Sequence, residues 1–477
     1  EQKLTLCDDV AGLSQAGEFP FNPDTSAGAE TECVSMFRYE AHVRPSSVQS
    51  QDYTFKVPDW RGMYEQQGEN LNGQLEQYEI FDYPGRYKDE QHGKDFTLYR
   101  MESLRSDAEK ATGQSNSPKL WPGTRFTLTG HPQKMLNREW QVIQSILSGD
   151  QPQALHGSQG RGTTLGNQLE VIPADRTWRP RVQSKPKVDG PQSAIVTGPA
   201  GEEIFCDEHG RVRVKFHWDR YHGMTEESSC WVRVSQAWAG PGFGNLAIPR
   251  VGQEVIVDFL NGDPDQPLVM GRTYHEDNRS PGDLPGTKTQ MTIRSKTYKG
   301  SGFNELRFED ATSNEQVYIH AQKNMDTEVL NDRTTDVKHD HTETIGNDQK
   351  ITVGLGQTVN VGSKKEGGHD QKVTVANDQT ITVQNDQRLD VTHDRHKDVG
   401  NDQISKIIGK DTEEVVKSQD IKVGEDYSLT VTNSLTIKVG ECLLKMNKDG
   451  TIILNGKSIQ IEGKDKINIF GADIDLD

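Results

Sequence analysis

The chain has 477 residues, enough for about three domains, yet only 32% of its residues are hydrophobic. Its 45 glycines and a mean hydropathy of -0.78 indicate that at least one large region folds with a thin core or a shared one. A formal net charge of -18 argues against proteins that bind nucleic acid or anionic lipid through bulk electrostatics. No apolar run is long enough for a membrane-spanning helix, and the five scattered cysteines are typical of reduced thiols.

Residues 1–188 are expected to form an α+β region with more strand than helix. LEQYEIFDYPGRYKDE (75–90) predicts an aromatic-rich strand that ends at the Pro84-Gly85 turn. FTLYRMESLRSDAEKATG (96–113) predicts an amphipathic helix. Its apolar positions are Leu98, Met101 and Leu104, and Gly113 stands where a C-cap belongs. LWPGTRFTLTGHP then alternates as a strand does, and the glycine-rich 157–166 segment is interpreted as a connection, since it lacks the Lys-Ser/Thr of a phosphate loop.

Residues 189–278 predict a small closed barrel. In GRVRVKFHWDR, apolar residues alternate with polar ones over a full strand, with Val212, Val214, Phe216 and Trp218 expected on one side. CWVRVSQAW and EVIVDFLNGDPDQPLVMG repeat this pattern, and the latter contains a turn from Gly262 to Asp265. Short alternating strands separated by Gly and Pro turns are typical of barrels.

An eight-residue repeat follows a polar joint. Residues 279–322 are expected to be a linker and the start of a β-helix, and residues 323–477 the repeat and a tip. If the Asn of Asn-Asp-Gln is position one, units begin at 323, 331, 339, 347 and 355 and, after the six residues SKKEGG (363–368), at 369, 377, 385, 393, 401, 409, 417, 425 and 433.

Position seven of the repeat is Val or Ile in every unit. These residues, the predicted core, are Val329, Val337, Ile345, Val353, Val361, Val375, Val383, Val391, Val399, Ile407, Val415, Val423, Val431 and Val439. Position five is apolar in eight units and position eight is Gly in six. Positions one to three are turn formers such as Asn and Asp, which tolerate the left-handed backbone that we expect at a corner. Each unit is therefore predicted to be one short strand followed by a corner.

A strand that buries one or two side chains cannot offset an ordering entropy of roughly 1 kcal/mol or more per residue, so the units must stack and share a narrow core. Two assemblies satisfy this requirement. In a single-chain β-helix, three units form one coil and the stack is about 22 Å tall; in a prism of three intertwined chains, each unit climbs one layer and the rod is about 67 Å long. The periodicity does not distinguish them, and SKKEGG is expected to be a bulge or loop in either.

Long motifs along the chain resemble the VgrG (valine-glycine repeat) spike proteins of bacterial type VI secretion systems, which are related to phage tail spike and hub proteins. The barrel motifs are DEHGRVRVKFHWDR and SSCWVRVSQAWAGPGFGNLAIPRVGQEVIVDFLNGDPDQPLVMG, followed by NELRFED and EQVYIHAQKNMD. The first region resembles the family's hub through YEIFDYPGRY, LWPGTRFTL and HPQKMLN. The barrel residues taken as the structural motif are Gly210, Arg211, Trp218, Asp219, Trp231, Arg233, Gly262, Asp263 and Pro264.

This resemblance implies the three-chain assembly: a mainly β homotrimer with an α+β phage-hub-like base, an OB-fold collar and an intertwined triple-stranded β-helix. The implied partners are an Hcp-like tube protein at the base and a PAAR-type tip protein or effector at the narrow end. The spike would assemble in the bacterial cytoplasm and then be translocated mechanically through a target membrane. The hub-like region resembles only the later part of the family's hub, so we expect residues before Glu1.

The tail KINIFGADIDLD supplies the predicted contacts with a tip partner. An uncapped strand end exposes unpaired edges in three chains at once, which favours a covering protein. The predicted contact residues are Ile469, Phe470, Ile474 and Leu476.

The sequence predicts a protein that is not an enzyme and needs no cofactor. It contains no Gly-x-Ser-x-Gly and no His-Glu-x-x-His, and the aspartates recur at one repeat position, as scaffold corners do. His339 and His341 stand at corner positions, so we expect no metal there, nor at His393 and His396. A calcium-binding array fits poorly because the period is eight. The alternatives kept open are a carbohydrate-cleaving phage-type tailspike with a β-helix and, third, an adhesin.

Overall fold

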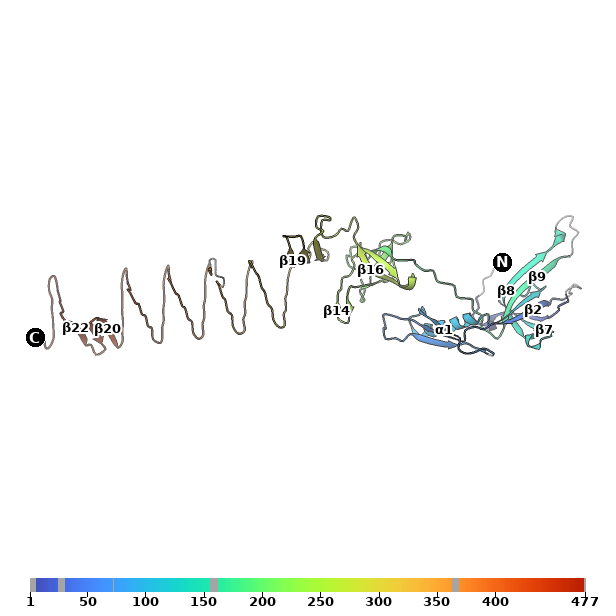
Figure 1. Ribbon diagram of the computed structural model, residues 1–477, viewed down its shortest axis with the longest axis horizontal. Coiled ribbons are helices and arrows are strands. Elements are labelled where there is room, and N and C mark those ends of the chain that lie inside the picture. Colours follow the sequence, from blue (N-terminus) through green and yellow to red (C-terminus); the bar gives the residue numbers. More distant parts are fainter. Residues whose placement is uncertain (1–5, 25–30, 72, 155–161, 363–368, 476–477) are drawn as a thin grey trace. The chain divides into compact units, whose positions relative to one another are not determined.

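The computed structural model describes residues 6–24, 31–71, 73–154, 162–362 and 369–475, and it divides into two compact units, Glu1–Asp336 and Val337–Asp477. Strands dominate the first unit, and a regular zigzag of chain dominates the second (Figure 1). Short 3-10 turns lie at Val10–Gly12, Lys134–Leu136, Pro152–Ala154 and Leu260–Gly262. Among the described helices, none has the length and apolar character needed to cross a bilayer.

A six-stranded sheet forms the largest core of unit 1. Its order is β1-β7-β8-β9-β6-β2. The strands are β1 Ser14–Pro20, β2 Val34–Ala41, β6 Glu109–Ser115, β7 Thr124–Thr129, β8 Glu139–Asp150 and β9 Thr164–Pro173. β1 pairs with β7 in parallel and the other neighbours are antiparallel. Every second residue of β7 is buried, with Phe126 and Leu128 packed near Trp140, so the strand predicted in LWPGTRFTLTGHP is confirmed.

A smaller sheet carries the single α-helix of the described chain. Strands β3 (Ser47–Gln51), β4 (Met63–Gln67) and β5 (Glu79–Asp82) lie in the order β4-β3-β5, and α1 (Glu90–Arg105) packs against β3 and β4. The strand predicted before the Pro84-Gly85 turn is confirmed as β5. Asp89 caps the helix, since its carboxylate accepts the His92 N–H at 3.0 Å.

The predicted helix is confirmed over residues 96–105, and Met101 of its predicted apolar face is buried, but its predicted boundaries and the inward position of Leu98 are wrong. It begins six residues earlier than expected and ends at Arg105, and Gly113 lies inside β6, where it pairs with Phe37 and Leu169. Its most buried positions are Gly93, Thr97 and Met101, one turn apart, whereas Leu98 is exposed. Gly93 lies against the Tyr64 ring, so a small residue is needed where the helix approaches β4.

A five-stranded barrel follows, as predicted. Its strands are β10 Gln192–Thr197, β11 Arg213–Phe216, β12 Arg233–Val234, β15 Glu254–Phe259 and β16 Pro267–Thr273, in the order β11-β10-β15-β16-β12. A bridge between Val212 and Val232 joins the two outer strands and closes the barrel. The core consists mainly of valines, including Val196, Val214 and Val255, which are fully shielded. A small ribbon, β13 Ala239–Gly240 with β14 Phe243–Gly244, projects from the same region.

Two three-stranded antiparallel sheets complete the described strands. The first, in unit 1, consists of β17 Gln290–Arg294, β18 Glu305–Glu309 and β19 Gln316–His320. The second, in unit 2, consists of β20 Ser434–Val439, β21 Cys442–Asn447 and β22 Ile452–Asn455. We call these the first and second meander. The repeat pattern does not predict the second meander, because Val439 also fits position seven of a repeat unit.

Candidate functional site

The repeat exposes a regular apolar stripe. Thirteen of the position-seven residues, from Val329 to Val431, are 45–53% exposed, whereas Val439 in β20 is 73% exposed. Apolar side chains at position five, before β20, are more exposed, at 56–67%. An almost constant exposure over so many units means that the same geometry recurs at each one. The stripe therefore has the uniformity of an interface that a partner covers.

The repeat backbone also forms no strand pairs in the part of it that the structure describes. Between residues 321 and 433, the described part of the chain forms no strand ladder with itself, although it is extended between bends. Backbone N–H and C=O groups of extended segments are normally paired when they leave water, and a row of unpaired groups is a template for another strand. Both the exposed side chains and the unladdered backbone of the described repeat thus favour a covering by further strands.

The corners of the repeat lie one residue earlier than predicted. The described bends fall at positions eight and one of the units, as at Gly346 and Asn347, rather than at positions one to three. The expected left-handed backbone at Asn and Asp is also wrong, because among the described repeat residues before β20 only Gly362 has a positive φ, of 92°. Instead, Asn385 donates a side-chain hydrogen bond to the carboxylate of Asp386 at 3.3 Å, and Asn377 does the same to Asp378.

The eight-residue period resumes after the second meander. Bends at 464–465 and 472–473 are again eight residues apart. In this register Ile469, at 62% exposed, stands at position five and Ile467, at 46%, at position three, while position seven is Gly471. Of the other predicted tip residues, Phe470 is 88% exposed and Ile474 is half exposed, while Leu476 lies outside the described residues. The signal for this continuation in the sequence is the spacing of Ile459 and Ile467, which are also eight residues apart.

The histidine pair of the repeat is solvated. His339 lies 2.8 Å from the carboxylate of Asp340, and both side chains are almost fully exposed. In the described ranges, no cluster of three or more His, Cys, Asp or Glu side chains is arranged to hold a metal ion.

The barrel motif residues hold turns and contacts. Gly210 has a positive φ of 67° and precedes Arg211, whose guanidinium pairs with Asp207 at 2.6 Å. Gly262, with a φ of 71°, accepts the Val188 N–H through its carbonyl at 2.9 Å. The other motif residues are Trp218, which stacks on Phe216; Asp219, which accepts from His222; Trp231, which stacks near Phe205; Arg233, which covers the Phe55 ring; Asp263, which accepts from Lys185; and Pro264, which is exposed in the turn.

One expectation for the barrel strand is wrong. Val212 and Val214 are fully buried, but Trp218 is mostly exposed, because β11 already ends at Phe216. The indole N–H of Trp218 donates to Gln192 at 2.8 Å on the surface.

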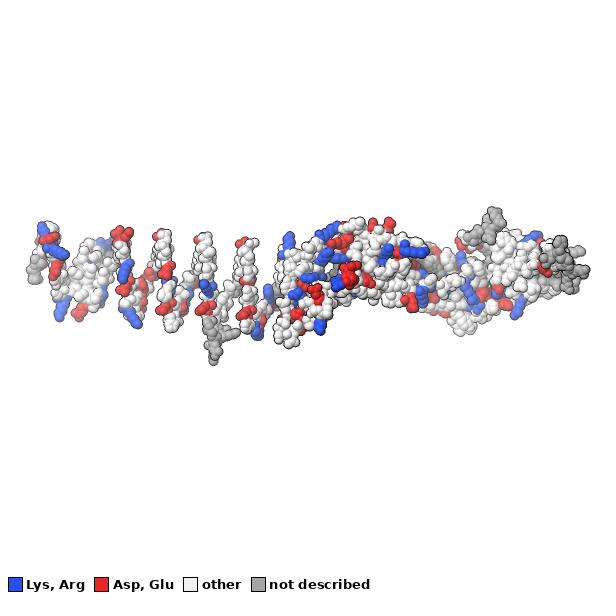
Figure 2. All heavy atoms as spheres, turned by 90° about the horizontal axis from the view of Figure 1, so that it is seen from above, with Lys and Arg blue, Asp and Glu red and all other residues white. Residues whose placement is uncertain are grey.

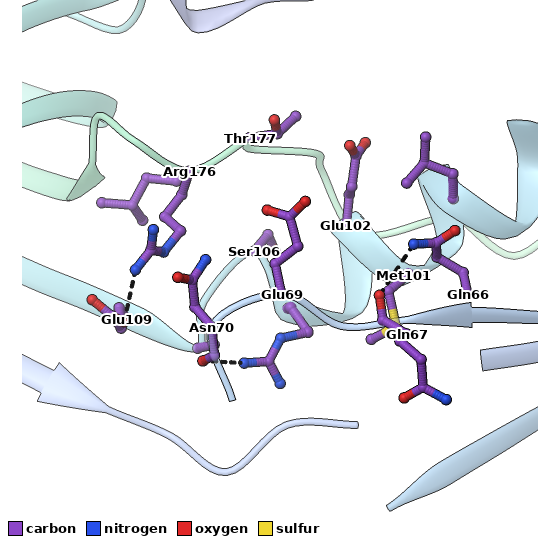
Figure 3. A pocket seen from close by; sticks show the side chains of 14 residues that line it. Gln66, Gln67, Glu69, Asn70, Met101, Glu102, Ser106, Glu109, Arg176 and Thr177 are labelled. Carbon is purple, nitrogen blue, oxygen red and sulfur yellow. Dashed lines mark hydrogen bonds and ion pairs between the residues drawn. The ribbon is translucent and has the colours of Figure 1, made fainter. Parts of the chain in front are cut away.

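A cavity beside α1 is lined by charged and amide side chains (Figure 3). Glu109 accepts from Arg138 at 3.0 Å and from Arg176 at 3.3 Å. Partial burial opposes ionisation of Glu109, but the two guanidinium partners prevail and lower its pKa. The carboxylate is thus held ionised as part of an ion-pair network, which favours a structural role over acid–base chemistry.

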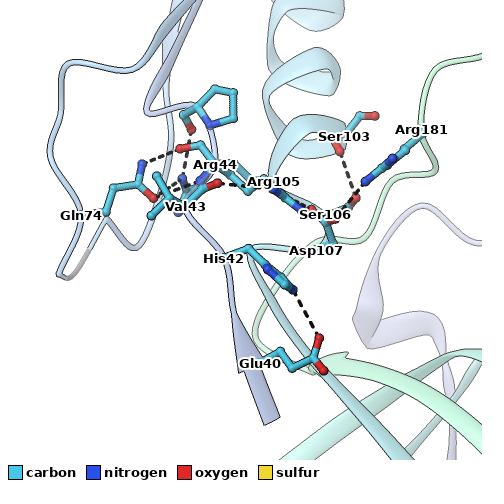
Figure 4. Close-up of polar contacts among 11 residues, drawn as sticks. Glu40, His42, Val43, Arg44, Gln74, Ser103, Arg105, Ser106, Asp107 and Arg181 are labelled. Carbon is cyan, nitrogen blue, oxygen red and sulfur yellow. Dashed lines mark hydrogen bonds and ion pairs between the residues drawn. The ribbon is translucent and has the colours of Figure 1, made fainter.

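A second network ties the end of α1 to distant segments (Figure 4). Asp107 accepts hydrogen bonds from Arg44 Nε at 2.6 Å and Nη2 at 2.7 Å, and from Arg181 at 3.1 Å. The hydrogen bonds from Arg44 are the main cause that lowers the pKa of Asp107 to about 2, against the opposing effect of burial. Arg44 and Arg181 lie far apart in the sequence, so this carboxylate holds three segments together.

Comparison with known families accounts for most of the chain. Residues 1–153 match the phage tail baseplate hub (GPD) model, and residues 205–274 match the type VI secretion system/phage-baseplate injector OB domain. The bacteriophage T4 gp5 C-terminal trimerisation domain matches twice, at residues 291–382 and 365–452.

Curated relatives point in the same direction. The chain is 48% identical over 332 residues to "Actin cross-linking toxin VgrG1" of Vibrio cholerae, a match that covers 69% of this chain and 30% of the relative. It is 47% identical over 337 residues to "Type VI secretion system spike protein VgrG3" of Vibrio cholerae, covering 70% of this chain and 33% of the relative. The chain thus spans about a third of the length of these relatives.

One similar solved structure is a type VI secretion component of E. coli, described as similar to T4 tail proteins gp27 and gp5. The match covers 56% of this chain and 51% of the E. coli chain, at 17% identity and a TM-score of 0.34. That likeness is too low to support an argument. The sequence matches favour the spike over the carbohydrate-cleaving tailspike. The chain belongs to the VgrG family of type VI secretion spike proteins.

Proposed function

We propose that three copies of this chain intertwine into a rigid needle that serves as the membrane-puncturing spike of a type VI secretion tube. The observation that carries the proposal is the row of half-exposed position-seven residues, on a backbone whose described residues form no strand ladder with their own chain. Three copies cover this stripe from all sides, since each copy contributes one side of a triangular prism and one third of its core. The double match to a trimerisation domain supports this stoichiometry.

The proposed roles of the four regions follow their order in the sequence. Residues 1–188 form the hub-like base, 189–278 the OB-fold collar, 279–322 the linker and start of the β-helix, and 323–477 the triple-stranded β-helix with its tip. The base would seat on an Hcp-like tube protein. Lys185 reinforces the joint between base and collar, because its ammonium bonds Asp263 at 2.5 Å and also Asp265.

The exposed apolar side chains of Ile469, Phe470 and Ile474 would receive a PAAR-type tip protein or an effector. Phe470 is the strongest candidate, because an aromatic ring that is 88% exposed beside other exposed apolar side chains is a typical interface residue. Leu476, outside the described residues, belongs to the same proposed contact.

The mechanism is mechanical and needs no catalytic group or cofactor. Charged side chains of both signs are spread along unit 2 (Figure 2). Three chains would carry a formal charge of 3 × -18 = -54, which keeps the needle soluble and disfavours adhesion to anionic membranes. The spike would assemble in the cytoplasm and then be pushed out of the cell and through the target membrane.

Light scattering and small-angle X-ray scattering of the purified chain test this proposal. We expect a particle three times the 53.4 kDa chain mass with a rod of about 67 Å beyond its base. A monomer with a stack of about 22 Å would instead fit the single-chain β-helix and refute the spike. Release of oligosaccharides from a polysaccharide panel would favour the tailspike.

A further inference from the structure

The two meanders each present one wholly apolar face. In the first meander, the cross-strand register places Met291, Phe308 and Val317 side by side, and next to them Ile293, Leu306 and Ile319. The opposite face carries the polar residues of the same strands, including Thr292, Arg307 and Glu305. Directly opposed residues of an antiparallel pair point to the same side of a sheet, so these six apolar side chains form one patch.

The first meander is inverted with respect to an ordinary amphipathic sheet. Its apolar residues Met291, Ile293, Val317 and Ile319 are 57–63% exposed, whereas Glu305 on the polar face is only 6% exposed. Glu305 pairs with Arg294 at 3.4 Å on that shielded face. A sheet that buries a glutamate and exposes its aliphatic side chains in the single chain is incomplete without a partner.

The second meander has the same construction. Leu435, Ile437 and Val439 of β20 oppose Met446, Leu444 and Cys442 of β21, and Ile452 and Leu454 of β22 extend this face. The two lysines of the paired strands, Lys438 and Lys445, lie on the other face. Eight apolar side chains without a charge among them thus share one side.

Two findings identify further copies of this chain as the partner that covers the two apolar faces. The first trimerisation-domain match begins at residue 291, in β17, and the second ends at residue 452, at the start of β22, so β18 to β21 and most of β17 fall within matched segments. Moreover, the meanders bracket the repeat, whose apolar stripe already requires copies of itself. Both patches are thereby continuous in sequence with the surface that the trimer covers.

The repeat itself cannot fix how the three chains align. Because position seven is Val or Ile in every unit, sliding one chain by eight residues places each core residue against an equivalent one. Registers with equivalent side-chain patterns are weakly specified. The six residues from 363 to 368 interrupt the period only once.

We propose that the two meanders are register clamps: in the trimer, the apolar faces of three copies pack against one another at each end of the repeat and hold the chains in a single alignment. This inference rests on the trimer of the proposed function. A chain that slips by one unit leaves both of its apolar faces misaligned with those of the other two copies. The slipped register is therefore penalised at the meanders although it is tolerated by the repeat.

Disulfide trapping in the full chain tests the alignment. All five native cysteines are first replaced. One chain then carries Val391→Cys and a second, differently tagged chain carries Val399→Cys, and the two chains are coexpressed and oxidised. By three-fold symmetry the same unit of each chain lies at the same height, so we expect links between equal positions to dominate in the aligned trimer. Neighbouring layers about 4.8 Å apart allow a background of 391–399 links, and slipped chains raise that fraction. We expect Ile293→Asp/Leu444→Asp to raise the 391–399 fraction at least fivefold.

The matched control is Thr292→Asp/Leu443→Asp, which places the same carboxylates one residue away on the opposite faces. Leu443 is a leucine in the same strand as Leu444 and, like it, is partly buried. We expect the control to leave the 391–399 fraction within twofold of the parent. A second readout is the rate of trimer dissociation in detergent, which we expect to rise at least tenfold for Leu444→Asp alone and less than twofold for Leu443→Asp.

The outcomes separate the two proposals. Equal effects of the two double variants, or an unchanged 391–399 fraction in both, would overturn the clamps while the trimer stands. Faster dissociation caused by Leu444→Asp but not by Leu443→Asp supports them independently. If native mass spectrometry finds the parent chain as a monomer, the proposed function itself fails.

Discussion

Replacing Val383 by alanine is the sharpest test of a core shared between chains. The substitution removes two carbon atoms from position seven, and a three-fold assembly repeats the loss three times at one level. At about 0.8 kcal/mol for each buried CH₂ group, the transfer term alone is ~1.6 kcal/mol per chain, or roughly 5 kcal/mol per trimer. Val383 is 47% exposed in the single chain, so about half of this energy, ~2.5 kcal/mol, arises only on assembly.

The adjacent Thr382→Ala variant is the matched control. Thr382 has nearly the shape of valine, is exposed, and lies on the other side of the same extended segment. A surface substitution of this kind changes the free energy of unfolding by about 0.5 kcal/mol or less. Guanidinium chloride unfolding, followed by circular dichroism at several chain concentrations, measures both variants.

A trimer that unfolds to three chains has a midpoint that rises with chain concentration. We expect this dependence for the parent and for both variants. Equal destabilisation by Val383→Ala and Thr382→Ala, or a midpoint independent of concentration, would refute the shared core.

Three further outcomes are expected. Asp107→Asn should lower the free energy of unfolding by about 2 kcal/mol at neutral pH, because the pKa of Asp107 is lowered from 3.8 to about 2. A carboxyl group with a lowered pKa stabilises the folded chain at pH values above its ordinary pKa, and this contribution is lost as the pH falls through the lowered pKa. Thermal unfolding curves of parent and variant should therefore converge as the pH falls from about 4 towards 2. Deleting residues 377–384, one whole unit, should preserve the trimer in native mass spectrometry, whereas deleting 377–380 should abolish it by shifting every following corner half a unit out of step with the prism. Phe470→Ala should weaken co-purification of a PAAR-type tip protein at least tenfold without dissociating the trimer, and an equal loss with Lys466→Ala would contradict a specific aromatic contact.

The strands of the barrel were predictable because period-two alternation coincides with burial there. Val212 and Val214 alternate with charged residues in the sequence and are fully shielded in the structure. The helix was less predictable, because residues 106–113 continue a helix-compatible pattern. Pairing of β6 with both β2 and β9 takes Glu109–Ser115 into the sheet, which shows tertiary structure overriding local preference.

The repeat was predicted in its period but not in the position of its corners. The corner falls at positions eight and one, and the backbone there keeps ordinary φ values, so no left-handed residue is required. The second meander escaped prediction because Val439 coincides with position seven while it pairs with Cys442 in a hairpin. Alternating apolar residues in three successive segments were the available signal, and the valine period concealed it.

The zigzag of unit 2 has a consequence for how a stack of such chains carries load. Strands that run across a long axis place their inter-strand hydrogen bonds along that axis, with about 4.8 Å between layers. A push from the base compresses every layer against the next, so the whole cross-section resists together. A pull loads the same bonds in series, and the weakest layer yields first. Such a needle is stiff in compression and weak in tension, which makes it suited to one outward stroke rather than to retraction.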